Sequence, residues 1–290
     1  MELTNISCVK RLMNEENIKF QKKFGQNFLI NPDVPRRIAD ECQTDRDSVI
    51  LEIGPGIGTL TQYLCENFKK VIAVEIDGGL IPILSKTLAE YDNVTVINAD
   101  IMKTDLSSLA KEYFDGEKVS VCANLPYYIT TPVITKLCES GVLFDTITVM
   151  VQKEVASRIC SSCGSSDWGA ISLFCSYYAK TRKLFDVAPG NFMPPPKVTS
   201  TVMQFDIYKE PPVVPKDVNL MFSLIKKAFE QRRKTLVNAL SGNFGVSKDD
   251  IRSAIIKMGK DENVRGEVLS LEEFSALSDM IYDIISPQNA

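Results

Sequence analysis

Short apolar runs recur along the first half of the chain, and each run ends in glycine or polar residues. The five runs begin near residues 49, 71, 94, 119 and 147. Segments with the apolar spacing of helices separate them, which predicts parallel strands joined by right-handed crossovers. Residues 199–207 have a further strand pattern. The sequence therefore predicts an α/β fold built on a doubly wound parallel sheet.

A proline-rich segment follows the last strand pattern. Residues 210–215 are Glu-Pro-Pro-Val-Val-Pro, a composition typical of a linker. Beyond it, helical periodicity continues to Ile285, interrupted between Gly242 and Gly245. We therefore expect two domains, 1–209 and 210–290, of which the second is small and all-α. Near the N-terminus, residues 32–41 predict a helix with Asn31 as its N-cap.

The first strand is followed by a glycine-rich turn. Residues 49–53 end in Gly54-Pro55-Gly56-Ile57-Gly58, and residues 59–68 then have a helical pattern. A strand, a glycine turn and a helix let a ligand approach the backbone closely at the helix N-terminus. The spacing is G-x-G-x-G, and dinucleotide-binding proteins have G-x-G-x-x-G instead. A turn with glycines for steric reasons alone remains an alternative.

Carboxylates end the next two strands. Glu75 follows Gly54 by 21 positions, where an acidic side chain can accept hydrogen bonds from both ribose hydroxyls of a nucleoside. Asp100 ends the third strand and can accept a hydrogen bond from an adenine amino group. Each could instead be a solvated strand end. Because the carboxyl ends of parallel strands share one edge of the sheet, the series favours a nucleoside cofactor bound across that edge.

The fourth strand ends in Asn124-Leu125-Pro126-Tyr127. A side-chain amide, a backbone stiffened by proline and an aromatic face can hold an exocyclic amine while the aromatic ring stacks on the attached base. A tight turn with a tyrosine in the core is the alternative. The cofactor pattern upstream favours a substrate amine beside the cofactor.

These motifs together resemble those of the ribosomal RNA adenine dimethyltransferases, in particular the bacterial small-subunit branch. The likeness covers nearly the whole chain. It rests on segments 22–29, 51–58, 75–77, 98–100, 124–127, 151–158, 192–198 and 228–236. The resemblance implies a class I methyltransferase domain, whose seven-stranded sheet would include a hairpin of residues 184–187 with residues 199–207. It also implies that S-adenosylmethionine is used to dimethylate N6 of two adjacent adenosines in the 3′-terminal hairpin loop of 16S rRNA.

Site residues follow from the resemblance position by position. Asn124 and the Leu125 carbonyl would accept the N6 protons, while Tyr127 and Phe192 would stack on the flipped base; Tyr128 could equally lie in the core. The residues implied for the cofactor are Gln26, Asn27, Leu29, Gly54, Glu75, Asp100 and Asn124. The expected partner is 16S rRNA within the immature 30S subunit, and we expect a monomer.

The net charge of −4 gives no sign of a nucleic-acid partner, but the basic residues are unevenly distributed. A single amphipathic helix through residues 222–236 would pair Lys226 with Arg233, and Lys227 with Lys234, on one face. With Arg232, and with Lys22 and Lys23 of the N-terminal arm, these residues are the predicted RNA contacts. An ordinary solvated helix face is the alternative.

Composition excludes several other classes of function. The chain has 290 residues and no histidine, which rules out His-based catalytic dyads, triads and zinc-water chemistry. The pair Cys160 and Cys163 has metal-ligand spacing, but no second such pair exists, and we expect no metal. There is no apolar stretch of membrane-spanning length and no signal-peptide core, so we expect a cytoplasmic protein.

Three other functions remain open. A macrolide-resistance methyltransferase shares the motif series but modifies large-subunit RNA. A ribosome-assembly factor could bind the same particle with incidental catalysis. The glycine spacing and the lack of a hydride-site candidate disfavour a nucleotide-dependent oxidoreductase.

Overall fold

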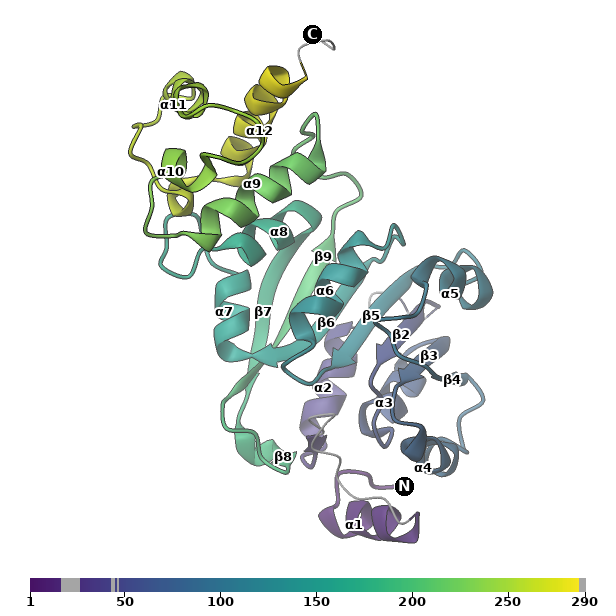
Figure 1. Ribbon diagram of the computed structural model, residues 1–290. Helices are drawn as coiled ribbons and strands as arrows, with labels where there is room; N and C mark the ends of the chain where they lie inside the picture. Colours follow the sequence, from purple (N-terminus) through teal and green to yellow (C-terminus); the bar gives the residue numbers. More distant parts are fainter. Residues whose placement is uncertain (17–26, 43–44, 46, 287–290) are drawn as a thin grey trace. The chain divides into compact units, whose positions relative to one another are not determined.

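The computed structural model describes residues 1–16, 27–42, 45 and 47–286. Seven strands form one sheet in the order β4-β3-β2-β5-β6-β9-β7 (Figure 1). Their bounds are β2 (Val49–Ile53), β3 (Lys70–Glu75), β4 (Val94–Asn98), β5 (Val119–Asn124), β6 (Thr146–Gln152), β7 (Ala179–Val187) and β9 (Ser200–Ile207). Strands β2 to β6 pair in parallel, while β9 pairs antiparallel with β6. The predicted α/β class and seven-stranded sheet are confirmed, and β7 begins earlier than residue 184.

Helices lie between the strands and after them. Those up to β7 are α1 (Ile6–Glu15), α2 (Asp33–Cys42), α3 (Thr59–Asn67), α4 (Ile81–Thr87), α5 (Leu106–Tyr113), α6 (Thr130–Glu139), α7 (Lys153–Ile159) and α8 (Ala170–Tyr178). After β9 follow α9 (Val218–Glu230), α10 (Leu236–Leu240), α11 (Lys248–Lys257) and α12 (Leu271–Ile285). Helix α2 begins one residue later than predicted, and the Asn31 side chain accepts from the Asp33 N–H at 3.1 Å, the kind of bond expected of an N-cap.

The central strands are buried on both faces, as strands of parallel sheets usually are. Every residue of β2 is buried, and β5 is buried up to Asn124. Ile50, Leu64 and Val71 belong to a core cluster that joins the sheet to α2 and α3. Because β2 to β6 are parallel, their carboxyl ends and the polar residues that follow them lie at one edge of the sheet.

A short two-stranded sheet completes this edge. Strand β1 (Phe28–Leu29) pairs antiparallel with β8 (Phe192–Met193), and Leu29 lies opposite Phe192. Asn31 Nδ2 donates to the Asn191 side-chain oxygen at 2.9 Å beside this pair. Two segments far apart in the sequence are thereby held together at the edge where the nucleoside site was predicted.

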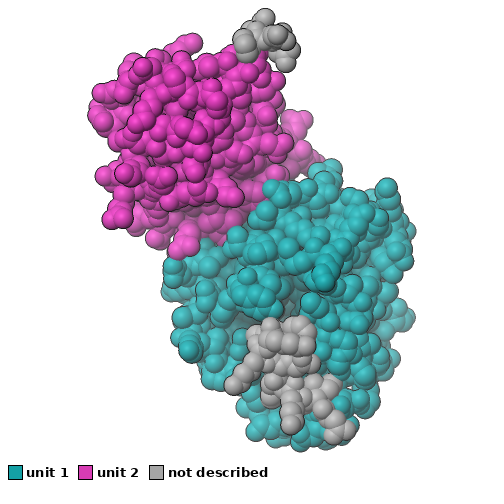
Figure 2. Space-filling view, in the orientation of Figure 1, with its two compact units in different colours: residues 1–156, 182–207 teal, residues 157–181, 208–290 magenta. Residues whose placement is uncertain are grey.

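The chain divides into two compact units (Figure 2). One contains residues 1–156 and 182–207, and the other contains residues 157–181 and 208–290. The division near residue 208 lies close to the predicted boundary, but the expected first domain, 1–209, did not separate residues 157–181. These residues cluster with the C-terminal helices because Trp168, Leu173 and Tyr177 pack in the core formed by α9 to α12. Trp168 Nε1 also donates to the Leu269 carbonyl at 3.1 Å.

Candidate active site

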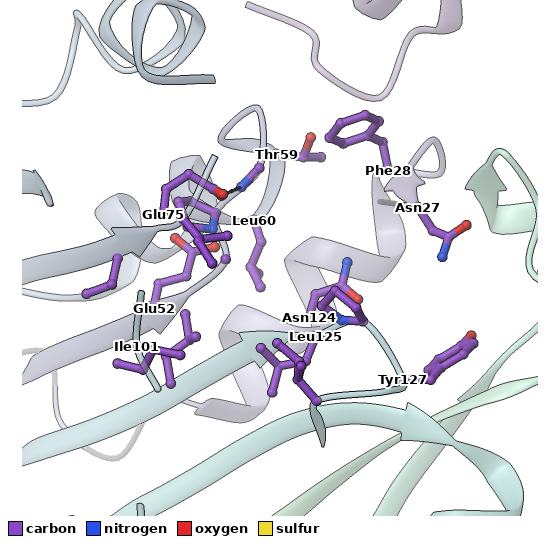
Figure 3. A pocket seen from close by; sticks show the side chains of 18 of the residues that line it. Asn27, Phe28, Glu52, Thr59, Leu60, Glu75, Ile101, Asn124, Leu125 and Tyr127 are labelled. Atoms are coloured by element: carbon purple, nitrogen blue, oxygen red, sulfur yellow. Dashed lines mark hydrogen bonds between the residues drawn. The ribbon is translucent and has the colours of Figure 1, made fainter. Parts of the chain in front are cut away.

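A cavity of about 300 Å³ opens at the carboxyl edge of the sheet, within the first unit. Its volume is at the lower end of the range of small-molecule sites. Nine of the predicted site residues line it: Asn27, Leu29, Gly54, Glu75, Asp100, Asn124, Leu125, Tyr127 and Phe192. In Figure 3, Glu75 and Tyr127 lie toward opposite ends, with Asn124 and Leu125 between them. Gln26, Lys22 and Lys23 lie outside the described residues.

Two glycines shape the turn after β2. Gly54 has a φ of +73°, and a Cβ built on it would meet no atom within 4 Å. Gly56 has a φ of +63°, and its Cβ would lie 3.2 Å from the Phe28 ring. Since L side chains rarely adopt a positive φ, glycine fits both positions. The missing side chain at Gly54 leaves open space beside the backbone, where a ligand can approach.

Glu75 is 4% exposed, and both of its carboxylate oxygens bond to backbone N–H groups. One accepts from Gly56 at 3.0 Å and the other from Asp77 at 2.8 Å. Burial raises the pKa of this carboxyl, while the backbone N–H bonds oppose the rise. A carboxylate has about four lone-pair positions, so acceptor capacity remains for a ligand hydroxyl. The dashed line in Figure 3 marks the bond that ties Glu75 to the glycine turn.

Asp100 lies in the turn after β4, and one of its two carboxylate oxygens already accepts a hydrogen bond from the backbone of that turn. Its Oδ1 accepts from the Met102 N–H at 2.9 Å. Its Oδ2 lies 3.9 Å from Lys103 Nζ, and 28% of its side chain is exposed. An acceptor oxygen is therefore available at the wall of the cavity.

Asn124 ends β5 and is half-buried. Among the described residues, neither its side-chain amide nor the Leu125 carbonyl has a hydrogen-bond partner. The turn itself is fixed, because the Pro126 carbonyl accepts from the Ile129 N–H at 3.1 Å and from the Thr130 hydroxyl at 3.3 Å. Two acceptor groups are thus presented on a rigid turn inside the cavity.

Three aromatic residues line the same cavity in different environments. Tyr127 is half-buried, and its hydroxyl lies 2.7 Å from the Ser200 hydroxyl. Phe192 is 3% exposed and packs in the core cluster with α2 and α3. Tyr128 is 63% exposed, so the core alternative that the sequence left open for it is excluded.

Glu52 also lines the cavity, and sequence analysis gave it no role. It is 1% exposed inside β2, and its Oε2 has no hydrogen-bond partner among the described residues. Burial raises its pKa to about 8, and the charge of Glu75 adds to the rise. The sequence did contain a signal for it, namely a glutamate inside an otherwise apolar strand. Acidic side chains are rarely buried unless they are paired or belong to a functional site.

The raised pKa of Glu52 predicts a pH dependence of stability. Between the ordinary value of 4.5 and about 8, the folded protein holds a proton that the unfolded chain has lost. The free energy of unfolding should therefore fall as the pH rises through this window, by at most about 1.4 kcal/mol per pH unit from this group. Urea unfolding of the ligand-free protein between pH 5 and 8 measures it.

Glu52→Gln should flatten this slope, because glutamine does not titrate. Glu90→Gln, at an exposed position in the same domain, is the matched control and should keep the wild-type slope. A Glu52→Gln protein with the wild-type slope would contradict the raised pKa.

The prediction of one continuous basic helix through residues 222–236 is wrong. Helix α9 ends at Glu230, and Thr235 caps a new helix by accepting from the Asn238 N–H. Lys226 and Arg233 therefore do not share a helix face, nor do Lys227 and Lys234. Lys226, Arg233 and Lys234 are exposed, whereas Lys227 forms an ion pair with Glu230 at 3.1 Å.

Arg232 is bonded within its own unit. Its Nη2 donates to the carbonyls of Ser166 and Trp168, at 2.9 and 3.1 Å, and lies 3.3 Å from the Glu267 carboxylate. The guanidinium thus holds the 157–181 segment against the C-terminal helices. An RNA contact by Arg232 stays a prediction.

This difference predicts that two adjacent arginines behave differently. Arg232→Ala should lower the free energy of unfolding by about 1 kcal/mol, because it removes hydrogen bonds to two carbonyls. Arg233→Ala should leave stability unchanged and weaken RNA binding, with a salt-dependence slope smaller by about one. Chemical denaturation and RNA binding across a salt series separate the two. Equal effects of both variants on both measurements would contradict the assignment.

Among the described residues, no group of three or more cysteine or acidic side chains could hold a metal ion. Cys163 Sγ donates to the Val268 carbonyl at 3.3 Å.

No described helix is both long and apolar enough to cross a bilayer.

The sheet order and the cavity at its carboxyl edge define a class I S-adenosylmethionine-dependent methyltransferase fold. Two solved structures share it over most of the chain, each under 25% identical. One is a dimethyladenosine transferase from Plasmodium falciparum, with a TM-score of 0.71, 24% identity and coverage of 86% of this chain and 95% of that one. The other is the 23S rRNA methyltransferase ErmE, with a TM-score of 0.67, 23% identity and coverage of 88% and 99%.

Sequence comparison is more specific than the fold. Residues 17–281 match the ribosomal RNA adenine dimethylase family, and the chain belongs to that family. Curated proteins named ribosomal RNA small subunit methyltransferase A are similar over nearly their whole length. The one from Lachnoclostridium phytofermentans is 50% identical, covering 93% of this chain and 94% of its own. The one from Alkaliphilus metalliredigens is 45% identical, covering 96% and 97%.

Proposed function

We propose that this chain uses S-adenosylmethionine to dimethylate N6 of two adjacent adenosines in the 3′-terminal hairpin loop of 16S rRNA. Family membership makes the chain an rRNA adenine dimethyltransferase, and its curated relatives carry the small-subunit name. The observation that carries the proposal is one cavity with Glu75 toward one end, Tyr127 toward the other and Asn124 between.

The residues present fit the cofactor. The open space beside Gly54 admits a ligand at the backbone, and the free lone pairs of Glu75 suit ribose hydroxyls. The buried Glu52 Oε2, which lacks a partner among the described residues, is available to a polar ligand group. When bound, S-adenosylmethionine supplies a methyl group on a positively charged sulfur. We propose Asn27, Leu29, Gly54, Glu75, Asp100 and Asn124 as the residues that hold it.

Methyl transfer to the adenine amine would depend mainly on how the N6 nitrogen is positioned and hydrogen-bonded. The N6 lone pair is delocalised into the ring, so the amine is a poor nucleophile. Asn124 Oδ1 and the Leu125 carbonyl would each accept a hydrogen bond from an N6–H group, which favours a pyramidal nitrogen with its lone pair directed at the methyl group. The proton that the nitrogen loses on methylation would leave to water. Tyr127 and Phe192 would hold the base by stacking, at roughly 1–3 kcal/mol per contact. Preorganised acceptors of this kind lower the barrier without a strong general base.

The partner and its setting are also proposals. The substrate form would be the immature 30S subunit, bound by a monomer in the cytoplasm. The exposed Lys226, Arg233 and Lys234 would contact phosphates, and Lys22 and Lys23 would add to them. This assignment explains how a chain with a net charge of −4 can bind RNA, because only the local charge matters at short range.

The decisive experiment is mass spectrometry of rRNA. Small subunits lacking the modification are incubated with the chain and labelled S-adenosylmethionine, and the 16S fragments are analysed. We expect two adjacent dimethyladenosines near the 3′ end. Label in 23S rRNA instead, with large subunits as substrate, would overturn the small-subunit assignment.

A further inference from the structure

The tyrosine of the candidate site is held by a residue that no motif singled out. The hydroxyls of Tyr127 and Ser200 lie 2.7 Å apart, although the residues are 73 positions apart in the sequence. Ser200 is 0% exposed and begins β9, while Tyr127 lines the cavity. A tyrosine ring that is held only by packing contacts can tilt by rotating about its side-chain torsions. A hydrogen bond at its tip restricts that tilt.

Ser200 is itself fixed on both sides. It lies opposite Gln152 in the antiparallel register of β6 and β9, and the Lys153 N–H donates to the Thr199 carbonyl at 3.0 Å. On the other side, the Thr201 hydroxyl donates to Asp186 at 2.7 Å. Asp186 also accepts from Lys153 Nζ at 2.6 Å. The backbone that carries the serine hydroxyl is thus fixed on the sheet.

We propose that Ser200 is a positioning residue for methyl transfer, whose hydroxyl sets the angle at which the Tyr127 ring receives the target adenine. This inference rests on the proposed function. The N6 atom of a stacked base takes its position from the plane of the ring beneath it. An ångström of misplacement can cost about a hundredfold in rate, so a bond that removes ring tilt bears directly on the chemical step.

The same bond could serve only to satisfy a buried hydroxyl, since buried polar groups generally find a partner. These two roles predict different measurements. A purely structural bond affects the free energy of unfolding and leaves methyl transfer by the folded protein unchanged. A positioning bond affects the rate at saturating substrate, while RNA affinity without cofactor, which phosphate contacts dominate, changes little.

The test uses Ser200→Ala, Tyr127→Phe and the double variant, with Ser200→Thr to restore a hydroxyl. Single-turnover methyl transfer to undermodified small subunits is measured at saturating subunits and S-adenosylmethionine. Affinity for the subunits without cofactor and the thermal midpoint are measured beside it. Each single variant should be about 3- to 10-fold slower, which corresponds to one net hydrogen bond. The double variant should be no slower than the singles, because both remove the same bond.

Ser120→Ala is the matched control. Ser120 is also 0% exposed and bonded to another hydroxyl, that of Thr146 at 3.1 Å, but it lies near the opposite end of β5 from Asn124. It should retain the wild-type rate, and Ser200→Thr should recover most of it. Wild-type rates in Ser200→Ala and Tyr127→Phe, or additive losses in the double variant, would overturn the proposal.

Two further outcomes of these measurements separate a folding defect and a failed function from a failed positioning role. If Ser200→Ala does not fold, Tyr127→Phe decides the question from the other end of the bond, because it removes only the hydroxyl of a half-buried ring. If the wild-type chain itself does not methylate 16S rRNA, the proposed function fails. If it does and both variants match it, only the positioning role fails.

Discussion

Replacing Asn124 with alanine is expected to slow single-turnover methyl transfer by about a hundredfold or more. The amide oxygen would accept a hydrogen bond from N6–H as the nitrogen becomes pyramidal, an interaction that is stronger in the transition state than in the bound substrate. Its side chain has no partner among the described residues and lies between Glu75 and Tyr127, so it is available for that contact. Affinity for small subunits should change much less.

The measurement needs saturating S-adenosylmethionine, because Asn124 would border both ligands and cofactor affinity should also fall. Asn67→Ala is a suitable control, since the Asn67 amide donates to Asp40 at the end of α3 and does not line the cavity. An Asn124→Ala protein that methylates subunits at the wild-type rate under these conditions would limit Asn124 to shaping the turn.

Glu75→Ala should weaken S-adenosylmethionine binding by about 10- to 150-fold in isothermal calorimetry. This range corresponds to the loss of charge-assisted hydrogen bonds worth about 1.5–3 kcal/mol. The free energy of unfolding should also fall, because the Gly56 and Asp77 N–H groups lose their acceptor. Removing a buried carboxylate whose pKa is raised by burial offsets part of that loss.

Glu75→Gln separates the charge from the shape. Glutamine has nearly the same shape but keeps an acceptor oxygen for only one of the Gly56 and Asp77 N–H groups, so it retains one of the two bonds to the turn. We expect an affinity between those of the wild type and the alanine variant. Unchanged affinity in Glu75→Ala would remove Glu75 from the cofactor site.

Much of the sheet and of the cavity could be predicted from the sequence because the signals are local. An apolar run, a glycine turn and a polar strand end are each read within about ten residues, and parallel pairing then brings the strand ends together. Gly54, Glu75, Asp100 and Asn124 were found in this way and line one cavity.

Features that could not be predicted from the sequence arise where long-range packing decides. The 157–181 segment has its own helix but no local sign that Trp168 packs with helices a hundred residues later. Ser200 is one of many serines until the fold brings it to Tyr127. The end of α9 at Glu230 had a weaker local signal: Thr235 before an apolar run is typical of an N-cap.

The division into two discontinuous units has a consequence for dissecting the protein. The backbone passes from one unit to the other at residues 156–157, 181–182 and 207–208. A single cut after residue 207 would therefore leave Trp168, Leu173 and Tyr177 attached to the sheet without the helices that bury them. Such a fragment would carry an aggregation-prone surface of its own. A catalytic fragment free of the helical unit requires residues 157–181 to be replaced by a short polar connection as well.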